Sequence, residues 1–153
     1  MKLAASSLGV ALVLIYVIGS GLWVNTGDGW YRGLNQPAWQ PPDFIFGIIW
    51  PYNFIVLGYA AVIVSHRLSA TLVATYLTVF AISVACALTW AFQFYRPHNL
   101  EAASLALTCV AVLTIALVAI ASRASWPLAF ALLPYQIWVS IASFLSWTYA
   151  RLN

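Results

Sequence analysis

The sequence has very few charged residues: Asp, Glu, Lys and Arg make up 6% of 153 residues, against about 25% in an ordinary soluble domain. Hydrophobic side chains reach 64%, and the mean hydropathy is +0.94. This composition excludes a water-soluble enzyme and a disordered segment. The six Lys and Arg residues are scattered and form no basic patch, which excludes a nucleic-acid partner. An integral membrane protein remains.

Cysteines and histidines are also scarce, with two of each. Cys86 and Cys109 fall inside apolar stretches, so they predict small hydrophobic contacts rather than a disulfide framework. His66 and His98 each lie at the end of such a stretch, where an interfacial position is expected, with haem or metal ligation as the alternative. The sequence shows no Ser/His/Asp or Cys/His arrangement and predicts no metal site.

Five windows without charge are long enough to cross a bilayer, since a helix needs about 20 apolar residues to span a core of about 30 Å. A chain in lipid must satisfy its own backbone, so helices or a closed barrel are the options. The apolar runs do not alternate with polar residues, which excludes the barrel. The sequence therefore predicts an all-α integral membrane protein, a single domain of five transmembrane helices. The expected spans are 3–24, 44–65, 69–95, 101–121 and 127–149.

The first span has an alternative interpretation as a secretory signal, because Lys2 precedes it and Gly19, Ser20 and Gly21 supply small residues. Its apolar stretch runs on to Val24, which exceeds the 7–15 residues of a typical signal core. A retained helix is therefore favoured.

The charged residues lie at or beyond the span ends. Asp28, Asp43 and Glu101 are all at such edges. Intramembrane charges usually mark ion or proton pathways, so a pump or an ion-coupled transporter is disfavoured. An odd number of spans places three cations on each side, so the positive-inside rule assigns no orientation.

Tryptophans of three spans are expected at a similar depth, near the side of the 25–43 loop. If their helical faces point inward, they line a cavity that opens toward this loop. Plain helix packing is the alternative, and for tryptophans nearer the span ends, such as Trp147, so is an aromatic belt at the membrane interface. The residues on these faces are Trp50, Asn53, Phe54 and Leu57, then Trp90 and Phe94, then Tyr135, Trp138, Ala142 and Tyr149.

The 25–43 loop combines glycines that permit turns with prolines that enforce extended backbone. An aromatic loop avoids water by lying over a cavity mouth, as a lid, or on the headgroups. A large, flat, apolar ligand suits such a site, with polar atoms of Asn53 and Gln136 to orient it. The aromatic residues of the loop are Trp30, Tyr31 and Trp39.

The end of the fifth span fits a proposed sterol-contact pattern through Leu145, Tyr149 and Arg151. An apolar span that ends in an interfacial Tyr and Arg also produces this pattern by default. Both interpretations stay open.

Small residues four apart on the third span permit the close approach of another helix. Ala81 and Ala85 form one such pair, and Ser83 and Ala87 form another. They favour a homodimer through this helix, with packing inside the bundle as the alternative.

The stretch from Trp30 to Trp50, WYRGLNQPAWQPPDFIFGIIW, resembles the WYxxLxxPxWxPPxxxFxxxW motif of the tryptophan-rich sensory protein/translocator protein family (TspO/MBR, which includes the peripheral benzodiazepine receptor). The segment 133–145, LPYQIWVSIASFL, is similar to that family's fifth helix, and the final Arg151-Leu-Asn to its C-terminus. The resemblance covers nearly the whole chain.

The resemblance implies a five-helix bundle, often dimeric, in a bacterial cell membrane, with a pocket covered by the first loop. The expected function is a receptor or translocator for porphyrins such as protoporphyrin IX, for sterols in some members, and for benzodiazepine-type compounds. The porphyrin is a ligand, and no cofactor is required. By resemblance, Tyr31, Pro41, Phe46, Asn53 and Ala142 line the ligand site.

Two alternative functions stay open. Trp50 and Trp138 match the tryptophans linked, in bacterial members of the family, to light-dependent breakdown of bound porphyrin, so they are candidate catalytic residues. A structural or partner-binding membrane protein with a solid core is the other alternative. The chain also departs from the family pattern, with Ala87 and Ser146 where Asn is frequent, and both changes are expected to remove polar groups from the bundle.

Overall fold

The computed structural model describes residues 2–153. Five of its helices are long and apolar enough to cross a membrane, which confirms the predicted all-α membrane bundle. The last two extend to Ala124 and Leu152 rather than to 121 and 149, because helical hydrogen bonding continues past the hydrocarbon core into the charged ends. The helices are α1 (Lys2–Trp23), α2 (Gly29–Gly33), α3 (Asp43–Arg67), α4 (Ala70–Tyr95), α5 (Leu100–Ala124) and α6 (Trp126–Leu152).

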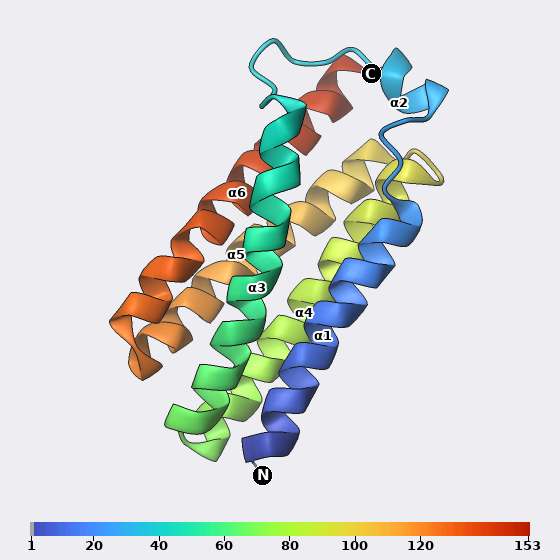
Figure 1. Ribbon diagram of the computed structural model, residues 1–153. Coiled ribbons are helices and arrows are strands. Elements are labelled where there is room, and N and C mark those ends of the chain that lie inside the picture. The colour runs from blue at the N-terminus through green and yellow to red at the C-terminus, as the bar shows by residue number, and fades with distance from the viewer. Residues whose placement is uncertain (1) are drawn as a thin grey trace.

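The five long helices form a closed ring (Figure 1). Helix α1 packs against α3 and α4, α4 also packs against α5, α5 against α6, and α6 against α3. The N-terminus and the C-terminus lie at opposite ends, as an odd number of passes requires (Figure 1). The short helix α2 and the lid loop therefore lie at the same end as the C-terminus of α6.

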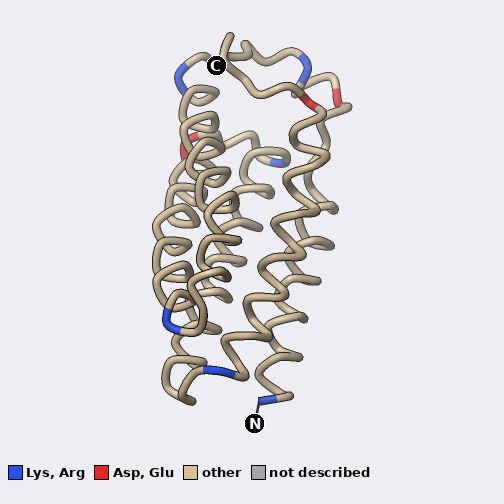
Figure 2. The backbone as a smooth tube through the Cα atoms, turned by 60° about the vertical axis from the view of Figure 1, so that its left-hand side comes forward, with Lys and Arg blue, Asp and Glu red and all other residues tan. Residues whose placement is uncertain are grey.

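The charged residues gather at the two ends of the bundle, with the carboxylates toward the lid end (Figure 2). Three of the cations donate to backbone carbonyls in or near the last turn of a neighbouring helix. Such carbonyls have no partner within their own helix and lie at the negative end of its dipole. These bonds are Lys2 Nζ to the His66 carbonyl at 3.0 Å, Arg67 Nη1 to Ala124 at 3.4 Å and Arg96 Nη2 to Leu22 at 3.5 Å.

Hydroxyl and amide groups join α5 to α6 within the membrane. Interhelical hydrogen bonds of this kind stabilise helix pairs in lipid, where the hydrophobic effect does not drive association. The bonds are Ser104 to Ser146 at 2.9 Å, Thr108 to Ser143 at 2.9 Å, Trp147 Nε1 to Thr108 at 3.0 Å and Gln136 Nε2 to the Ala111 carbonyl at 3.1 Å.

This set of bonds corrects one expectation and adds to another. Ser146 is buried and paired, so the bundle keeps a polar group at this position. The Trp147 indole donates to the Thr108 hydroxyl of α5, so this side chain joins two helices in addition to its expected position at the membrane interface. Ala87, in contrast, is completely buried and contributes only a methyl group.

The two small-residue pairs of α4 face different ways. Ser83 and Ala87 are buried inside the bundle, where they pack against the other helices. Ala81 is half-buried and Ala85 is exposed on the outer surface. Only the pair Ala81 and Ala85 therefore remains available for a contact with another molecule outside the bundle.

Helices α1 and α3 approach each other closely at Gly9. A Cβ atom built on Gly9 would lie 2.4 Å from the Cβ of Ala61, closer than two carbon atoms can approach. Ala61 is completely buried at this contact. The absence of a side chain at Gly9 therefore permits the two backbones to pack.

We expect Gly9→Ala to lower the free energy of unfolding by about 1–3 kcal/mol, because the added methyl group overpacks the α1–α3 contact. Gly21→Ala is the matched control on the same helix, since a Cβ there meets nothing within 4 Å. The control should be neutral or slightly stabilising. Thermal unfolding in detergent measures both variants, and equal melting temperatures would contradict the close approach.

Candidate functional site

The chain from the lid into α3 runs antiparallel to α6. Figure 1 shows the loop leaving α2, crossing the end of α6 and descending to the start of α3. The lid and α3 form one continuous stretch of chain, and so does α6. Each contact between the two stretches therefore limits which residues can meet at the next contact. The contacts, from the end of the bundle inward, are Asn35 with Asn153, Gln40 with Tyr149, Phe46 with Trp138 and Tyr52 with Ala131.

The first half of the lid forms the short helix α2, where the sequence predicted turns and extended backbone only. Asp28 caps this helix, since its Oδ1 accepts from the backbone N–H of Trp30 at 2.5 Å and of Tyr31 at 3.2 Å. The Trp30 ring stacks on His98, with centroids 3.6 Å apart, and meets Phe94 edge-on at 5.7 Å. Aromatic contacts therefore hold this half against α4 and its following turn.

The second half of the lid is held by polar side chains. Asn153 Oδ1 accepts from the Asn35 backbone N–H at 2.8 Å, and Asn153 Nδ2 donates to the Asn35 carbonyl at 3.2 Å. Asn35 Nδ2 in turn donates to the Leu152 carbonyl at 3.1 Å, and the Tyr149 hydroxyl donates to Gln40 Oε1. Asn35 and Asn153 are exposed, so water can compete for these bonds.

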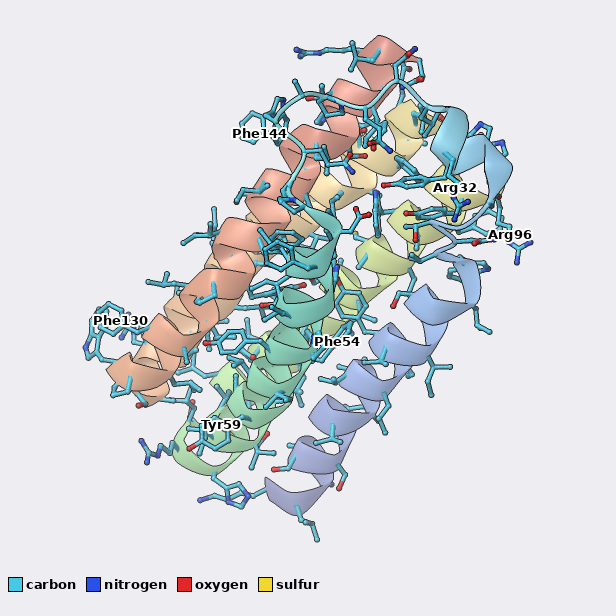
Figure 3. All side chains as sticks on the ribbon, turned by 45° about the horizontal axis from the view of Figure 1, so that its top comes forward. Arg32, Phe54, Tyr59, Arg96, Phe130 and Phe144 are labelled. Carbon is cyan, nitrogen blue, oxygen red and sulfur yellow. The ribbon has the colours of Figure 1, made fainter. Side chains whose placement is uncertain are left out.

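Beneath the lid, two of the predicted tryptophans touch. Trp50 of α3 and Trp138 of α6 meet edge to face, with ring centroids 6.5 Å apart. Phe46 packs on Trp138 at 4.9 Å, and Phe54 stacks on Trp50 at 5.6 Å. Tyr16 of α1 closes the group against Trp50 and Phe54 at 6.1 and 5.1 Å. Figure 3 shows Phe54 on the inner side of α3, toward α1.

The third predicted tryptophan, Trp90, belongs to a neighbouring aromatic group. Its ring packs on Phe94 at 6.1 Å and on Tyr95 at 6.2 Å. Tyr31 of the lid reaches the same group, at 6.3 Å from Phe94 and 6.1 Å from Tyr149. Trp90 also packs against the main core, so the two groups form one aromatic wall beneath the lid.

Comparison with known proteins identifies the family of this chain. The model of the TspO/MBR family matches residues 8–152. The chain belongs to the TspO/MBR family. Relatives include the uncharacterized membrane protein YtaB of Bacillus subtilis, 32% identical over 94% of this chain and 97% of that protein. The tryptophan-rich protein TspO of Chlorobaculum tepidum is 29% identical over 88% and 86% of the two chains, and the human translocator protein 29% over 97% and 86%.

Several predicted site residues of this TspO/MBR-family chain lie apart from the aromatic wall or deeper than expected. Trp39 is 50% exposed on the lid. Pro41 is half-buried in the lid, and Ala142 is half-buried against the core. Tyr135 is fully buried in the main core.

The predicted sterol-contact residues do not share one surface. Leu145 and Tyr149 are buried with Phe94 and Ala103 under the lid, whereas Arg151 is exposed. A ligand on the outer surface of α6 would reach Arg151 but not the other two side chains. The structure therefore does not assemble this pattern into an outward-facing site.

Several polar atoms in the interior of the bundle have no hydrogen-bond partner among residues 2–153. Two of them, the Tyr76 hydroxyl and Gln136 Oε1, do not belong to the aromatic wall. The other four are the indole Nε1 atoms of Trp90 and Trp138 and the amide nitrogen and oxygen of Asn53, which is completely buried. An unpaired buried polar group costs about 1–3 kcal/mol, and lipid offers no partner. The unpaired atoms of Asn53, Trp90 and Trp138 mark the aromatic wall as a place where a bound molecule would gain hydrogen bonds.

The rings of Trp50 and Trp138 fill the space between them, which agrees with the alternative of a solid core. The unpaired polar atoms agree with the alternative of a ligand site. A flat ligand can enter between these two rings only if they separate, so binding requires the wall and the lid to move. Within residues 2–153, no group of three His, Cys, Asp or Glu side chains could hold a metal ion.

Sequence reasoning missed the residues that fasten the lid. Asn35, Gln40 and Asn153 are ordinary polar residues in a loop and at a helix end, and no spacing rule pairs them. Asp28, which precedes Gly29 and the aromatic pair Trp30 and Tyr31, was the local signal, because an Asp before a short helical turn is a common cap.

We expect Asn153→Ala to release the second half of the lid. Hydrogen exchange of the Asn35 amide should become about tenfold faster or more, because this amide loses its acceptor and faces water. The amides of Trp30 and Tyr31 should keep their rates, since Asp28 still binds them. Asn25→Ala is the control, because its side chain bonds only within the loop. Unchanged exchange at Asn35 would show that other contacts fasten the lid.

Proposed function

We propose that this multi-pass membrane protein binds flat, largely apolar ligands of the porphyrin type, such as protoporphyrin IX. The ligand would lie along the aromatic wall, under the lid, and the protein would act as a receptor or translocator. The observation that carries this proposal is the set of unpaired polar atoms on Asn53, Trp90 and Trp138. Sites for such ligands combine aromatic surface with a few polar groups that fix orientation.

Family membership supports the proposal. Relatives include proteins named tryptophan-rich protein TspO, from bacteria, and the human translocator protein. We extend this to the present chain as a proposal: a bacterial cell membrane as its location, and sterols or benzodiazepine-type compounds as further ligands. The ligand is the only small molecule that the proposal requires.

We expect the double variant Trp50→Phe/Trp138→Phe to bind protoporphyrin IX at least tenfold more weakly than the unsubstituted protein. The variant loses stacking area at both rings and the indole donor of Trp138. Titration of the purified protein, with loss of porphyrin fluorescence or of tryptophan emission as the signal, measures the dissociation constant.

Trp126→Phe is the matched control for this titration, because Trp126 is 67% exposed on the outside of α6. Its affinity should equal that of the unsubstituted protein. Equal affinity in the double variant would remove the assignment of the site to these rings. Absence of saturable binding in every form would favour a structural or partner-binding protein.

Light-dependent degradation of bound porphyrin is the second candidate function. The contact between Trp50 and Trp138 favours it, because an excited porphyrin at this pair would have two oxidisable indoles in its first layer of neighbours. Illumination of the complex should then bleach the porphyrin absorption faster than for free porphyrin in detergent, and more slowly in the double variant. Equal bleaching with and without the protein would exclude this function.

We also propose that the chain forms a homodimer through α4. An open hollow of about 630 Å³ lies on the outer face of this helix, lined by Ala70, Thr71, Ala74, Thr75, Thr78 and Val79. Small residues continue along the helix to the exposed Ala85. Ala74→Phe should fill the hollow and shift chemical cross-linking in detergent from dimer to monomer, whereas Val112→Phe on the exposed face of α5 should not.

A further inference from the structure

Asn53 leaves two buried polar atoms unpaired, whereas Tyr76, Trp90, Gln136 and Trp138 each leave one. Asn53 is completely buried, and neither its amide nitrogen nor its amide oxygen has a partner among the described residues. The serine and threonine hydroxyls that join α5 to α6 are paired, and Gln136 donates through Nε2 to Ala111 and Ser140 at 3.1 and 3.2 Å. A fully unpaired amide lowers stability, so its presence calls for a physical explanation.

The position of Asn53 connects it to the aromatic wall. It lies on the same face of α3 as Trp50 and Phe54, three residues after the first and immediately before the second. Trp50 in turn contacts Trp138, whose indole nitrogen is also unpaired. A molecule stacked along this wall would therefore lie next to an amide that still has both hydrogen-bonding atoms free.

The chemistry of the amide defines its complement. A primary amide presents one donor and one acceptor side by side, about 2 Å apart, on a planar group. A lactam or an uncharged carboxylic acid presents the same edge in reverse, so the two groups can form a pair of parallel hydrogen bonds. An ester or an N-methylated lactam keeps the acceptor but lacks the donor, and would leave the Asn53 oxygen unpaired.

We propose that Asn53 selects ligands that carry a hydrogen-bond donor and acceptor side by side on one edge, namely a lactam or an uncharged carboxylic acid. This inference rests on the proposed function, since it names the polar chemistry of a ligand that lies on the aromatic wall. The low polarity of the site strengthens both hydrogen bonds and raises the penalty for a ligand that satisfies only one of them.

The first test compares protoporphyrin IX with its dimethyl ester. The unsubstituted protein should bind the free acid about tenfold more tightly than the ester, and Asn53→Leu should bind both with the same affinity within about twofold. A preference that persists in Asn53→Leu, or the absence of any preference in the unsubstituted protein, would overturn the carboxylic-acid form of the proposal.

The second test uses a lactam and does not depend on porphyrin binding. Quinolin-2-one should raise the melting temperature of the unsubstituted protein more than N-methylquinolin-2-one does, and this difference should vanish in Asn53→Leu. If both the acid and the lactam preferences are absent or independent of Asn53, the inference fails. If protoporphyrin IX does not bind but the lactam preference holds, only the porphyrin proposal fails.

Stability gives a separate readout. Leu has the branched shape of Asn without its polar atoms but is larger, so Asn53→Val, which is closer to Asn in volume, is measured beside it. At least one of the two variants should melt at a higher temperature than the unsubstituted protein when no ligand is present. Gln136→Leu is the matched control, because it removes a side chain that is hydrogen-bonded across the α5–α6 contact, and it should melt at a lower temperature without changing ligand preference. Lower melting temperatures for both Asn53→Leu and Asn53→Val would show that the amide supports the fold and would overturn a role in ligand selection.

Discussion

Lipid supplies no hydrogen-bond partners, and this constraint decides how the protein is built. Helices satisfy the backbone, and hydroxyl groups on α5 and α6 pair with each other across the contact, as Ser104 and Ser146 do. Where α1 meets α3, Gly9 provides close approach in place of polar bonds. Against this background the unpaired amide of Asn53 stands out, because the same constraint makes it costly.

The lid is fastened by two kinds of interaction with different sensitivity to water. Trp30 and Tyr31 hold the first half through aromatic contacts with α4, its following turn and α6. Asn35 and Asn153 hold the second half through hydrogen bonds at exposed positions, where water can replace each partner. A lid of this construction would open from its second half, while α2 stays in place. Such an opening would expose Phe46 and Trp138 first.

The aromatic wall is closed in this structure, with Trp50 and Trp138 in contact. A closed wall with unpaired polar atoms is consistent with a site that opens for its ligand, since the ligand would both replace the ring contact and pair the free atoms. A solid core would instead gain stability from apolar residues at Asn53. Under the proposed function, the arrangement trades stability for recognition, which is common at functional sites.

The sequence by itself determined the five membrane helices, because the hydrophobic length needed to cross a bilayer is local information. It also determined the lid and the aromatic content of the site, since the Trp30–Trp50 motif is continuous along the chain. Only the tertiary structure decided that Trp50 touches Trp138 whereas Trp90 joins the neighbouring group, and that Asn153 fastens the lid. Helical spacing gives the face of a residue but not the rotation and depth of its helix, and those are set by packing against the other helices.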